Sequence, residues 1–236
     1  MTVNLRSTAI IITGAFGSLG AATARAAAQA GARVTLVDRA AEAPRDLVED
    51  CGPEAIAIGG VDLTNASDAA QAVDRACHRM QGLDALINIA GAFRWQTLAD
   101  GDLDTWDLLF AINVKTAVNA SRAALPHLRR RGSGRIINVG ANAALKAGAG
   151  MGAYAASKAA VHALTQSLAE EVKSENITVN AVLPSIIDTP ANRADMPRAD
   201  FSTWVTPQSL ASVILFLASA GAQAITGTLL PVTGRV

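Results

Sequence analysis

The sequence has few aromatic residues, almost no cysteine and no excess of charge of either sign. Lys and Arg together number 20, the same as Asp and Glu together. Because a protein that binds nucleic acid normally carries a basic excess, this balance argues against a nucleic-acid partner. Two cysteines, Cys51 and Cys77, are too few for a disulfide framework, and their spacing is not that of a metal site.

Segments that would send a chain to a membrane are also missing. No apolar run reaches the length of a membrane span, and residues 1–6 do not read as a signal peptide. The three histidines, His78, His127 and His162, have no Cys or His partner nearby in the sequence, so we expect no metal site. We therefore expect a cytoplasmic protein that contacts neither a membrane nor a nucleic acid.

Apolar residues are abundant, and their pattern predicts the fold class. Hydrophobic residues make up 50% of the sequence, which is enough to bury a large core. Short apolar runs alternate with longer amphipathic stretches, and strands separated by helices indicate parallel pairing. We expect an α/β fold, a single doubly wound Rossmann domain over residues 1–236, with a parallel sheet of about seven strands. The expected strands are residues 9–13, 34–37, 55–58, 85–88, 135–139, 178–182 and 228–232.

Most of the intervals between these strands read as helices. Residues 103–130 form one long helical stretch, which we expect Pro126 to kink or interrupt. Residues 153–173 form a second long helix. Residues 185–206 contain two prolines and several charges without a period, so we expect an excursion loop there.

A glycine-rich turn, Thr-Gly-Ala-Phe-Gly-Ser-Leu-Gly from Thr13 to Gly20, joins the first strand to the first helix. Such glycines permit a tight turn and a close approach to a pyrophosphate, which the amides of the helix N-terminus bind. Asp38 ends the next strand, where a carboxylate accepts both ribose hydroxyls and repels a 2′-phosphate. We expect a dinucleotide site that prefers NAD(H), with NADP(H) the alternative because Arg39 can pair with a phosphate. A mere tight turn and a solvated acid are the opposing interpretations.

Tyr154 and Lys158 are four residues apart on an expected helix and therefore share one face. A phenol with an ordinary pKa of about 10 is a poor acid–base catalyst at neutral pH. A nearby ammonium group lowers that pKa, so the tyrosine can exchange a proton with a carbonyl or imine. From the spacing alone, a structural tyrosine beside an exposed lysine explains the pair equally well. The dinucleotide turn upstream favours the catalytic interpretation.

With these motifs in this order, the chain resembles the short-chain dehydrogenase/reductase family from residue 9 to residue 234. The resemblance implies that Tyr154 and Lys158 are catalytic, that Lys158 also binds the nicotinamide ribose, and that Asn113 supports a water relay. It also implies a small-molecule substrate and a homotetramer or homodimer. In such an assembly the helices at 103–130 and 153–173 would pair with their symmetry mates, helped by the small residues Ala155, Ala159 and Ala163.

The family's cofactor contacts map onto the glycine turn, the ends of four strands and the segment after residue 183. The residues that the resemblance implies are Gly14, Phe16, Gly17, Ser18, Leu19, Gly20, Asp38, Arg39, Asp62, Leu63, Asn88, Ala90, Gly91, Tyr154, Lys158, Pro184, Ile187 and Thr189.

One departure from the family bears on the substrate. The family's catalytic serine falls at Ala141, 13 residues before Tyr154, and alanine cannot hydrogen-bond a carbonyl. Either Asn142 substitutes for it, or the substrate does not need such a donor. Residues 140–205 are similar to dihydropteridine reductase, a branch that reduces quinonoid dihydropterins with NADH. The N-terminal half, with Asn88 and Asn113, instead resembles an ordinary bacterial-type reductase.

We therefore expect an oxidoreductase that uses NAD(P)H, NADH preferred, and passes hydride to a carbonyl or imine carbon while Tyr154 gives the proton. The segment at 185–206 is then its substrate-side loop. A 3-oxoacyl or general ketone reductase is an alternative, and the loss of the serine at Ala141 also allows a non-catalytic NAD(H)-binding regulator. Phe93, Trp95 and Trp204 are candidates to stack on a substrate ring, although loop packing explains them equally well.

Overall fold

A single seven-stranded sheet organises the fold. The computed structural model describes residues 3–236, and its strand order is β3-β2-β1-β4-β5-β6-β7. Every pairing between neighbouring strands is parallel, which confirms the predicted α/β Rossmann sheet. The strand order reverses between β1 and β4, and such a switch point is where open α/β sheets bind ligands.

The strands lie close to their predicted positions. They are β1 (Ala9–Thr13), β2 (Arg33–Val37), β3 (Ile56–Ile58), β4 (Ala85–Asn88), β5 (Gly134–Val139), β6 (Ile177–Pro184) and β7 (Leu229–Val232). The strand expected at 178–182 continues to Pro184, because Leu183 and Pro184 still pair with β7. In β1, Ile10 and Ile12 enter one hydrophobic core and Ile11 the other, as the alternation of side chains along a strand requires.

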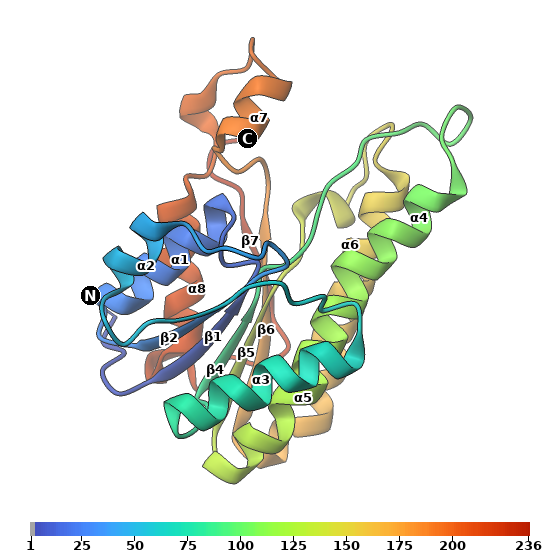
Figure 1. The fold of residues 1–236 in the computed structure, drawn as a ribbon. Helices are drawn as coiled ribbons and strands as arrows, with labels where there is room; N and C mark the ends of the chain where they lie inside the picture. The colour runs from blue at the N-terminus through green and yellow to red at the C-terminus, as the bar shows by residue number, and fades with distance from the viewer. Residues whose placement is uncertain (1–2) are drawn as a thin grey trace.

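Helices cover both faces of this sheet (Figure 1). They are α1 (Ser18–Gln29), α2 (Arg45–Cys51), α3 (Ala66–Met80), α4 (Leu103–Phe110), α5 (Thr116–Arg131), α6 (Gly152–Val172), α7 (Pro190–Asp195) and α8 (Pro207–Ala218). Helices α1 and α8 pack on one face, and α3, α5 and α6 pack on the other. No helix within residues 3–236 is both long and apolar enough to cross a membrane.

The long helical stretch is interrupted, but not where the sequence indicated. A π-helical turn at Ala111–Lys115 separates α4 from α5, while α5 runs without a break through Pro126. Pro126 lies on the exposed side of α5, and the opposite side buries Ala120, Ala124 and Leu128 completely. Packing of that buried side holds the helix together despite the hydrogen bond that proline cannot donate. The predicted interruption at Pro126 is therefore wrong.

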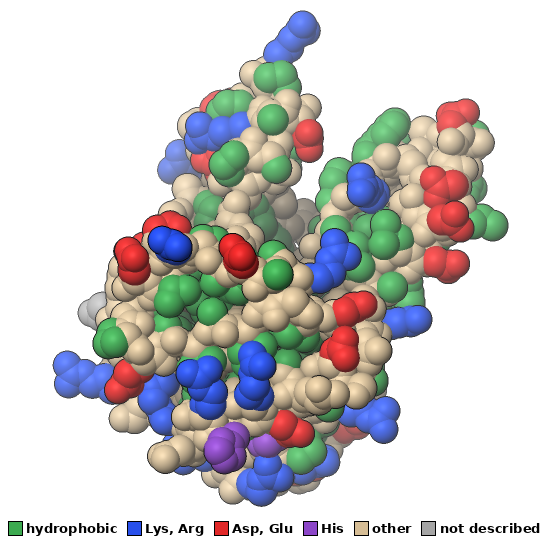
Figure 2. Space-filling view, viewed as in Figure 1, with side chains coloured by type: hydrophobic (Ala, Val, Ile, Leu, Met, Phe, Trp, Pro, Cys, Tyr) green, Lys and Arg blue, Asp and Glu red, His purple; other side chains and the backbone are tan. Residues whose placement is uncertain are grey.

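The segment at 185–206 is an ordered arm rather than an irregular loop. It contains α7 and a 3-10 turn at Phe201–Thr203, and a parallel bridge between Ile187 and Val205 closes its base. The amide of Asp188 donates to the carbonyl of Val205 at 2.8 Å. Figure 1 shows this arm rising above the sheet, across a gap from α4. Figure 2 shows the same gap as a hollow in the molecular surface.

Candidate active site

The glycine turn after β1 is shaped by close backbone contacts. Gly14 has a φ of +64°, and a Cβ there would lie 2.7 Å from the amide nitrogen of Ala90. A Cβ on Gly20 would lie 2.1 Å from the carbonyl oxygen of Gly14. Helix α1 starts after Gly17, and no side chain caps its first turn. The amides of that turn are therefore open to an anion, which fits the pyrophosphate expected there.

Asp38 is held directly beside this turn. Its two carboxylate oxygens each accept one backbone amide, that of Phe16 at 2.9 Å and that of Ala40 at 3.0 Å. Each oxygen keeps a lone pair that can accept a ribose hydroxyl. Arg39, the residue that complicates the cofactor preference, is exposed. The geometry therefore fits the adenosine end of a dinucleotide.

The segment after β3 lies next to Asp38. The amide of Val61 donates to the carbonyl of Asp38 at 3.0 Å. Asp62 is exposed, and hydrogen bonds from the hydroxyl and amide of Thr64 lower the pKa of its carboxyl. Leu63 is buried in the core, so of this expected pair only Asp62 offers a polar side chain to a ligand.

The end of β4 is fixed by Thr13 and by a buried amide. The Thr13 hydroxyl accepts the amides of Ile89 at 3.1 Å and Ala90 at 3.3 Å. Asn88 donates to Ser121 at 3.1 Å and to Asn138 at 2.9 Å, so its side chain links β4 to α5 and β5. Asn88 is 5% exposed and therefore supports the cofactor surface from behind rather than forming it.

Gly91 lies where two polar side chains of the site meet. A Cβ on Gly91 would lie 2.6 Å from Oδ1 of Asn113 and 3.4 Å from Nζ of Lys158. Only a glycine leaves room for both groups at this position. The structure thereby brings together residues from the segment after β4, the π-helical turn and α6.

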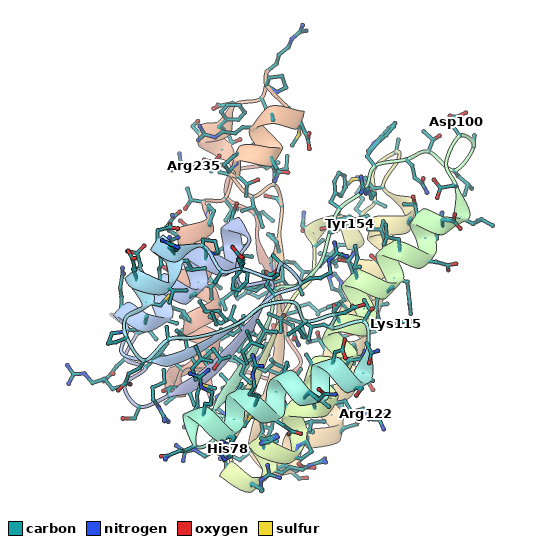
Figure 3. All side chains as sticks on the ribbon, viewed as in Figure 1. His78, Asp100, Lys115, Arg122, Tyr154 and Arg235 are labelled. Carbon is teal, nitrogen blue, oxygen red and sulfur yellow. The ribbon has the colours of Figure 1, made fainter. Side chains whose placement is uncertain are left out.

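Tyr154 and Lys158 project from α6, and Tyr154 lies at the gap between α6 and the arm (Figure 3). The ammonium group of Lys158 is buried and donates to the carbonyl of Val139 at 2.7 Å. Burial raises the pKa of Tyr154 to about 12. Burial also lowers the pKa of Lys158 to about 8. The expectation that Lys158 lowers the pKa of Tyr154 is wrong for this geometry, because loss of water around the phenol dominates.

Aromatic rings line the same side of the gap. The ring of Phe93 meets Tyr154 edge to face, with centroids 4.9 Å apart, and Phe93 is 46% exposed. The indole of Trp95 donates to the carbonyl of Ala149 at 3.0 Å and lies against Gly150. Trp204, in contrast, is only 6% exposed within the arm, so it presents no face for a substrate ring.

Asn113 is held by three hydrogen bonds to protein groups. Its Oδ1 accepts the amide of Ala92 at 2.8 Å, and its Nδ2 donates to the carbonyl of Ala92 at 3.1 Å and to Ser157 at 2.9 Å. The Ser157 hydroxyl in turn donates to the carbonyl of Tyr154 at 2.8 Å. Sequence reasoning missed Ser157, although its place three residues after Tyr154 puts it on the same face of α6. The water relay through Asn113 stays a prediction.

The position of the family serine also has an unpredicted neighbour. Ala141 is buried, and its amide donates to Nε2 of His162 at 3.3 Å. Asn142, the candidate substitute for the serine, begins a 3-10 turn at Asn142–Ala144 and is half-buried. Position 141 has no side-chain hydroxyl, so a substrate oxygen beside it cannot accept a hydrogen bond from a serine there.

The residues expected at the nicotinamide loop lie at the base of the arm. Pro184 ends β6, and Ile187 forms the bridge to Val205. The hydroxyl of Thr189 accepts the amide of Asn192 at 3.2 Å and caps α7. Thr189 therefore keeps its hydroxyl proton for a ligand. Among the described residues, no group of three His, Cys, Asp or Glu side chains is placed to hold a metal ion.

Comparisons with known proteins agree with this geometry. A family model described as short chain dehydrogenase matches residues 8–199. The 2-(S)-hydroxypropyl-CoM dehydrogenase 3 of Xanthobacter autotrophicus is 32% identical, over 99% of this chain and 98% of its own length. A 3-oxoacyl-(acyl-carrier-protein) reductase of Thermotoga maritima is 30% identical over 98% of both chains. An uncharacterized oxidoreductase of Staphylococcus aureus is 29% identical over 92% of both.

Proposed function

Because the chain belongs to the short-chain dehydrogenase family, we propose that it is an NAD(P)H-dependent oxidoreductase in which Tyr154 gives a proton to a carbonyl or imine substrate. The observation that carries the proposal is that α6 places Lys158 beside Gly91 and Tyr154 at the gap. The bound dinucleotide supplies the hydride. The residues of the chain hold it, orient the substrate and supply the proton.

Tyr154 is suited to act as the acid in reduction. Burial keeps its phenol protonated at neutral pH, so the proton is present when the substrate arrives. We assign the binding of the nicotinamide ribose to the buried amine of Lys158. We assign replacement of the proton to a water relay supported by Asn113, whose side chain fixes the π-helical turn against α6.

The remaining roles follow from the contacts of each group. The glycine turn would bind the pyrophosphate through the amides of the first turn of α1. Asp38 would accept the ribose hydroxyls and favour NADH. The segment at 185–206 would form the substrate side of a single dinucleotide-binding domain. The first two roles depend on the open amides at the start of α1 and on the free lone pairs of the Asp38 carboxylate.

Within this class, we propose a quinonoid dihydropterin or a similarly electron-poor ring as the substrate. Support comes from the similarity of residues 140–205 to dihydropteridine reductase and from Ala141, which leaves no serine to polarise a ketone. The exposed rings of Phe93 and Trp95 form an apolar wall on the segment after β4, and Phe93 meets the ring of Tyr154 edge to face. Such a ring accepts hydride readily and needs the proton more than a second hydrogen-bond donor.

A ketone or 3-oxoacyl substrate is the competing proposal, and the relative from Thermotoga maritima favours it. In that case Asn142 would replace the serine as donor. The variant Ala141→Ser separates the two proposals when initial rates are measured with ketones and with quinonoid dihydropterin. A large rise in ketone reduction alone means that the native pocket was not built for ketones. No rise, together with strong ketone reduction by the unmodified protein, supports Asn142 as the donor.

The variant Tyr154→Phe tests the enzymatic proposal itself. Because general acid catalysis contributes on the order of 10²–10⁴ in rate, we expect turnover to fall more than about a hundredfold with NADH affinity unchanged. NADH oxidation is followed over a panel of carbonyls, quinones and quinonoid pterins. Near-normal turnover of the variant would remove Tyr154 from the mechanism. Tight NADH binding without oxidation of any panel member would instead favour a regulator that senses NAD(H).

A further inference from the structure

Two side chains of α6 form hydrogen bonds to the backbone at and just after the end of β5. Lys158 donates from Nζ to the carbonyl of Val139 at 2.7 Å. One helical turn later, His162 accepts the amide of Ala141 on Nε2 at 3.3 Å. The two side chains are four residues apart on the helix, and the two backbone groups are two residues apart at the strand end. Both side chains are buried.

Gly140, between these two anchored residues, packs directly on the imidazole. A Cβ at Gly140 would lie 2.5 Å from Nε2 and 2.7 Å from Cδ2 of His162. The ring therefore touches the backbone of Gly140, and only glycine allows that contact. The amide of Gly140 is itself fixed, because it donates to the carbonyl of Val182 at 2.9 Å. The backbone at Gly140 and Ala141 is thus held between β6 and His162.

Gly140 and Ala141 directly precede residues of the candidate active site. Ala141 occupies the position that the family resemblance gives to a catalytic serine, and it has an extended backbone with φ −157° and ψ 141°. The 3-10 turn that follows starts at Asn142, the candidate donor to the substrate. The orientation of the Ala141 amide therefore sets what this turn presents beside Tyr154.

Resting on the oxidoreductase function proposed above, we propose that His162 is a positioning residue: its neutral imidazole anchors Ala141 under the substrate, and protonation of the ring releases that anchor and lowers turnover. An imidazolium donates from both nitrogens, so it cannot accept the amide of Ala141. His162 touches no reacting atom and acts only through Ala141 and the turn after it.

The charges around His162 favour the neutral ring. Burial lowers the pKa of His162 below its ordinary value of 6.5, and the nearby ammonium group of Lys158 lowers it further. No titratable side chain comes from β6, and β5 carries only Arg135, near its opposite end. The charged groups of α4 and the π-helical turn, which also pack against α6, are exposed: Asp104, Asp107 and Lys115.

The variant His162→Gln separates positioning from simple packing. Its amide oxygen can replace Nε2 as the acceptor but does not titrate, whereas His162→Leu fills the space without any acceptor. We expect turnover of the unmodified protein to fall as the pH drops below about 6.5, because burial and Lys158 hold the pKa of His162 below that ordinary value. His162→Gln should keep its turnover and lose this acid limb. His162→Leu should lose about tenfold at every pH, the equivalent of one buried hydrogen bond.

The exposed histidine of α3 provides the matched control, because His78→Gln makes the same chemical change outside the site. Its pH profile should follow that of the unmodified protein. An acid limb that persists in His162→Gln overturns the proposal, and so does full activity of His162→Leu across the range. Equal unfolding midpoints in urea for His162→Gln and the unmodified protein show that a change in stability does not cause the loss of the acid limb.

A second measurement does not depend on turnover. Nitrogen-15 NMR of the histidine rings, with the His162 signal assigned from its loss in His162→Gln, reports which ring nitrogen carries the proton. We expect a proton on Nδ1, a bare Nε2 at neutral pH, and a titration midpoint below 6.5. A proton on Nε2 overturns the proposal. If the unmodified protein reduces no substrate, the proposed function fails, while this measurement still decides whether His162 accepts from Ala141.

Discussion

Burial moves the pKa values of the two central side chains of the site in opposite directions. It raises the pKa of Tyr154 to about 12 and lowers that of Lys158 to about 8. Both shifts have the same physical cause, since removal from water disfavours the charged form of each group. At neutral pH the phenol is therefore protonated and can donate its proton. The buried amine is charged at that pH, and burial of this charge lowers the free energy of unfolding.

The stability of the protein should depend on pH through Lys158. The unfolded chain binds this proton up to the ordinary pKa of 10.5, and the folded chain only up to about 8. Stability should therefore rise between these values, by on the order of 2–3 kcal/mol. Tyr154 acts in the opposite sense above its ordinary pKa of 10.0, where the folded state keeps the proton and stability falls. Urea unfolding at several pH values measures both slopes.

Substitution assigns the first slope. In Lys158→Met we expect the rise in stability above pH 8 to disappear relative to the unmodified protein. Lys115→Met is the control, because Lys115 is exposed and its substitution removes the same charge from the surface. Burial raises the pKa of both cysteine thiols, but Cys51 and Cys77 are common to all three proteins, so their contribution cancels in the comparison. A rise retained in Lys158→Met would show that another group causes it.

Cofactor preference should depend on the carboxylate of Asp38. A 2′-phosphate beside it meets like-charge repulsion and loses two hydrogen bonds, worth roughly 2–4 kcal/mol in a partly desolvated site. An exposed pair between Arg39 and the phosphate recovers only about 1 kcal/mol. We expect NADH to exceed NADPH at least about tenfold in kcat/KM, since the balance of these terms favours it.

Two variants of Asp38 separate its charge from its hydrogen bonds. Asp38→Ala should mostly erase the preference, while Asp38→Asn keeps one acceptor for a backbone amide and should erase the repulsion alone. Glu42→Ala, which removes an exposed charge from the same loop, should leave the ratio of kcat/KM values unchanged. Equal use of NADH and NADPH by the unmodified protein would mean that Asp38 does not meet the ribose.

At the scale of elements, the segment after β4 and the segment before α6 are locked together beside the site. Trp95 donates to the carbonyl of Ala149, and the amide of Gln96 donates to the carbonyl of Gly150 at 2.9 Å. Gly150 has a φ of +74°, and a Cβ there would lie 2.1 Å from Cε2 of Trp95. The wall that carries Phe93 therefore depends on a glycine in the facing segment.

The variant Gly150→Ala should displace this wall and lower kcat/KM with the substrate. Gly132→Ala is a close control, because Gly132 has a φ of +73° but nothing within 4 Å of the added Cβ. Both variants should lose about 1–2 kcal/mol of stability from the left-handed backbone. Only Gly150→Ala should also lose activity. Equal activity of the two variants would exclude the Trp95 segment from the site.

The interruption of the long helix shows why element boundaries escaped the sequence. Pro126 gave the only visible signal, yet α5 continues through it because its buried side is packed. The actual break at Ala111–Lys115 coincides with Asn113, whose amide bonds Ala92 and Ser157. These partners are distant in sequence, so no local pattern could predict the turn. The same reason applies to the arm, which the bridge between Ile187 and Val205 closes.

At the scale of the molecule, α4 and α5 leave an apolar strip on the surface. Leu103, Phe110 and Val118 are 78%, 47% and 37% exposed. Acidic residues gather at the α4 end (Figure 2), while Lys115 at the end of the π-helical turn and Arg122 on α5 are basic (Figure 3). Two copies in antiparallel orientation would set each acidic end against a basic one. The expected small-residue contact on α6 needs one correction, since Ala155 is buried while Ala159 and Ala163 are exposed.

We propose a homotetramer or homodimer that uses this surface. Phe110→Asp should lower the mass measured by light scattering at micromolar concentration, because a charge in an apolar contact is costly. Leu98→Asp makes a similar change at an 82% exposed loop position and should leave the mass unchanged. A monomeric unmodified protein would contradict the proposal. An unchanged mass in Phe110→Asp would place the contact on another face.

The sequence by itself determined the features that depend on residues close together in the chain. The apolar runs predicted the parallel strands, the turn from Thr13 to Gly20 predicted the open start of α1, and the spacing of Tyr154 and Lys158 put both on one helix face. Each of these features follows from strand alternation, turn chemistry or the helical period, which act over a few residues.

Only the tertiary structure decided the properties that arise between distant segments. It buried Tyr154 and so raised its pKa, although the sequence had indicated a lowered one. It enclosed Trp204 in the arm, while leaving Phe93 against the Tyr154 ring. It also placed His162 under Ala141, 21 residues earlier in the chain. Burial and long-range contacts create these effects, because desolvation and packing depend on what the fold brings together rather than on what lies next in sequence.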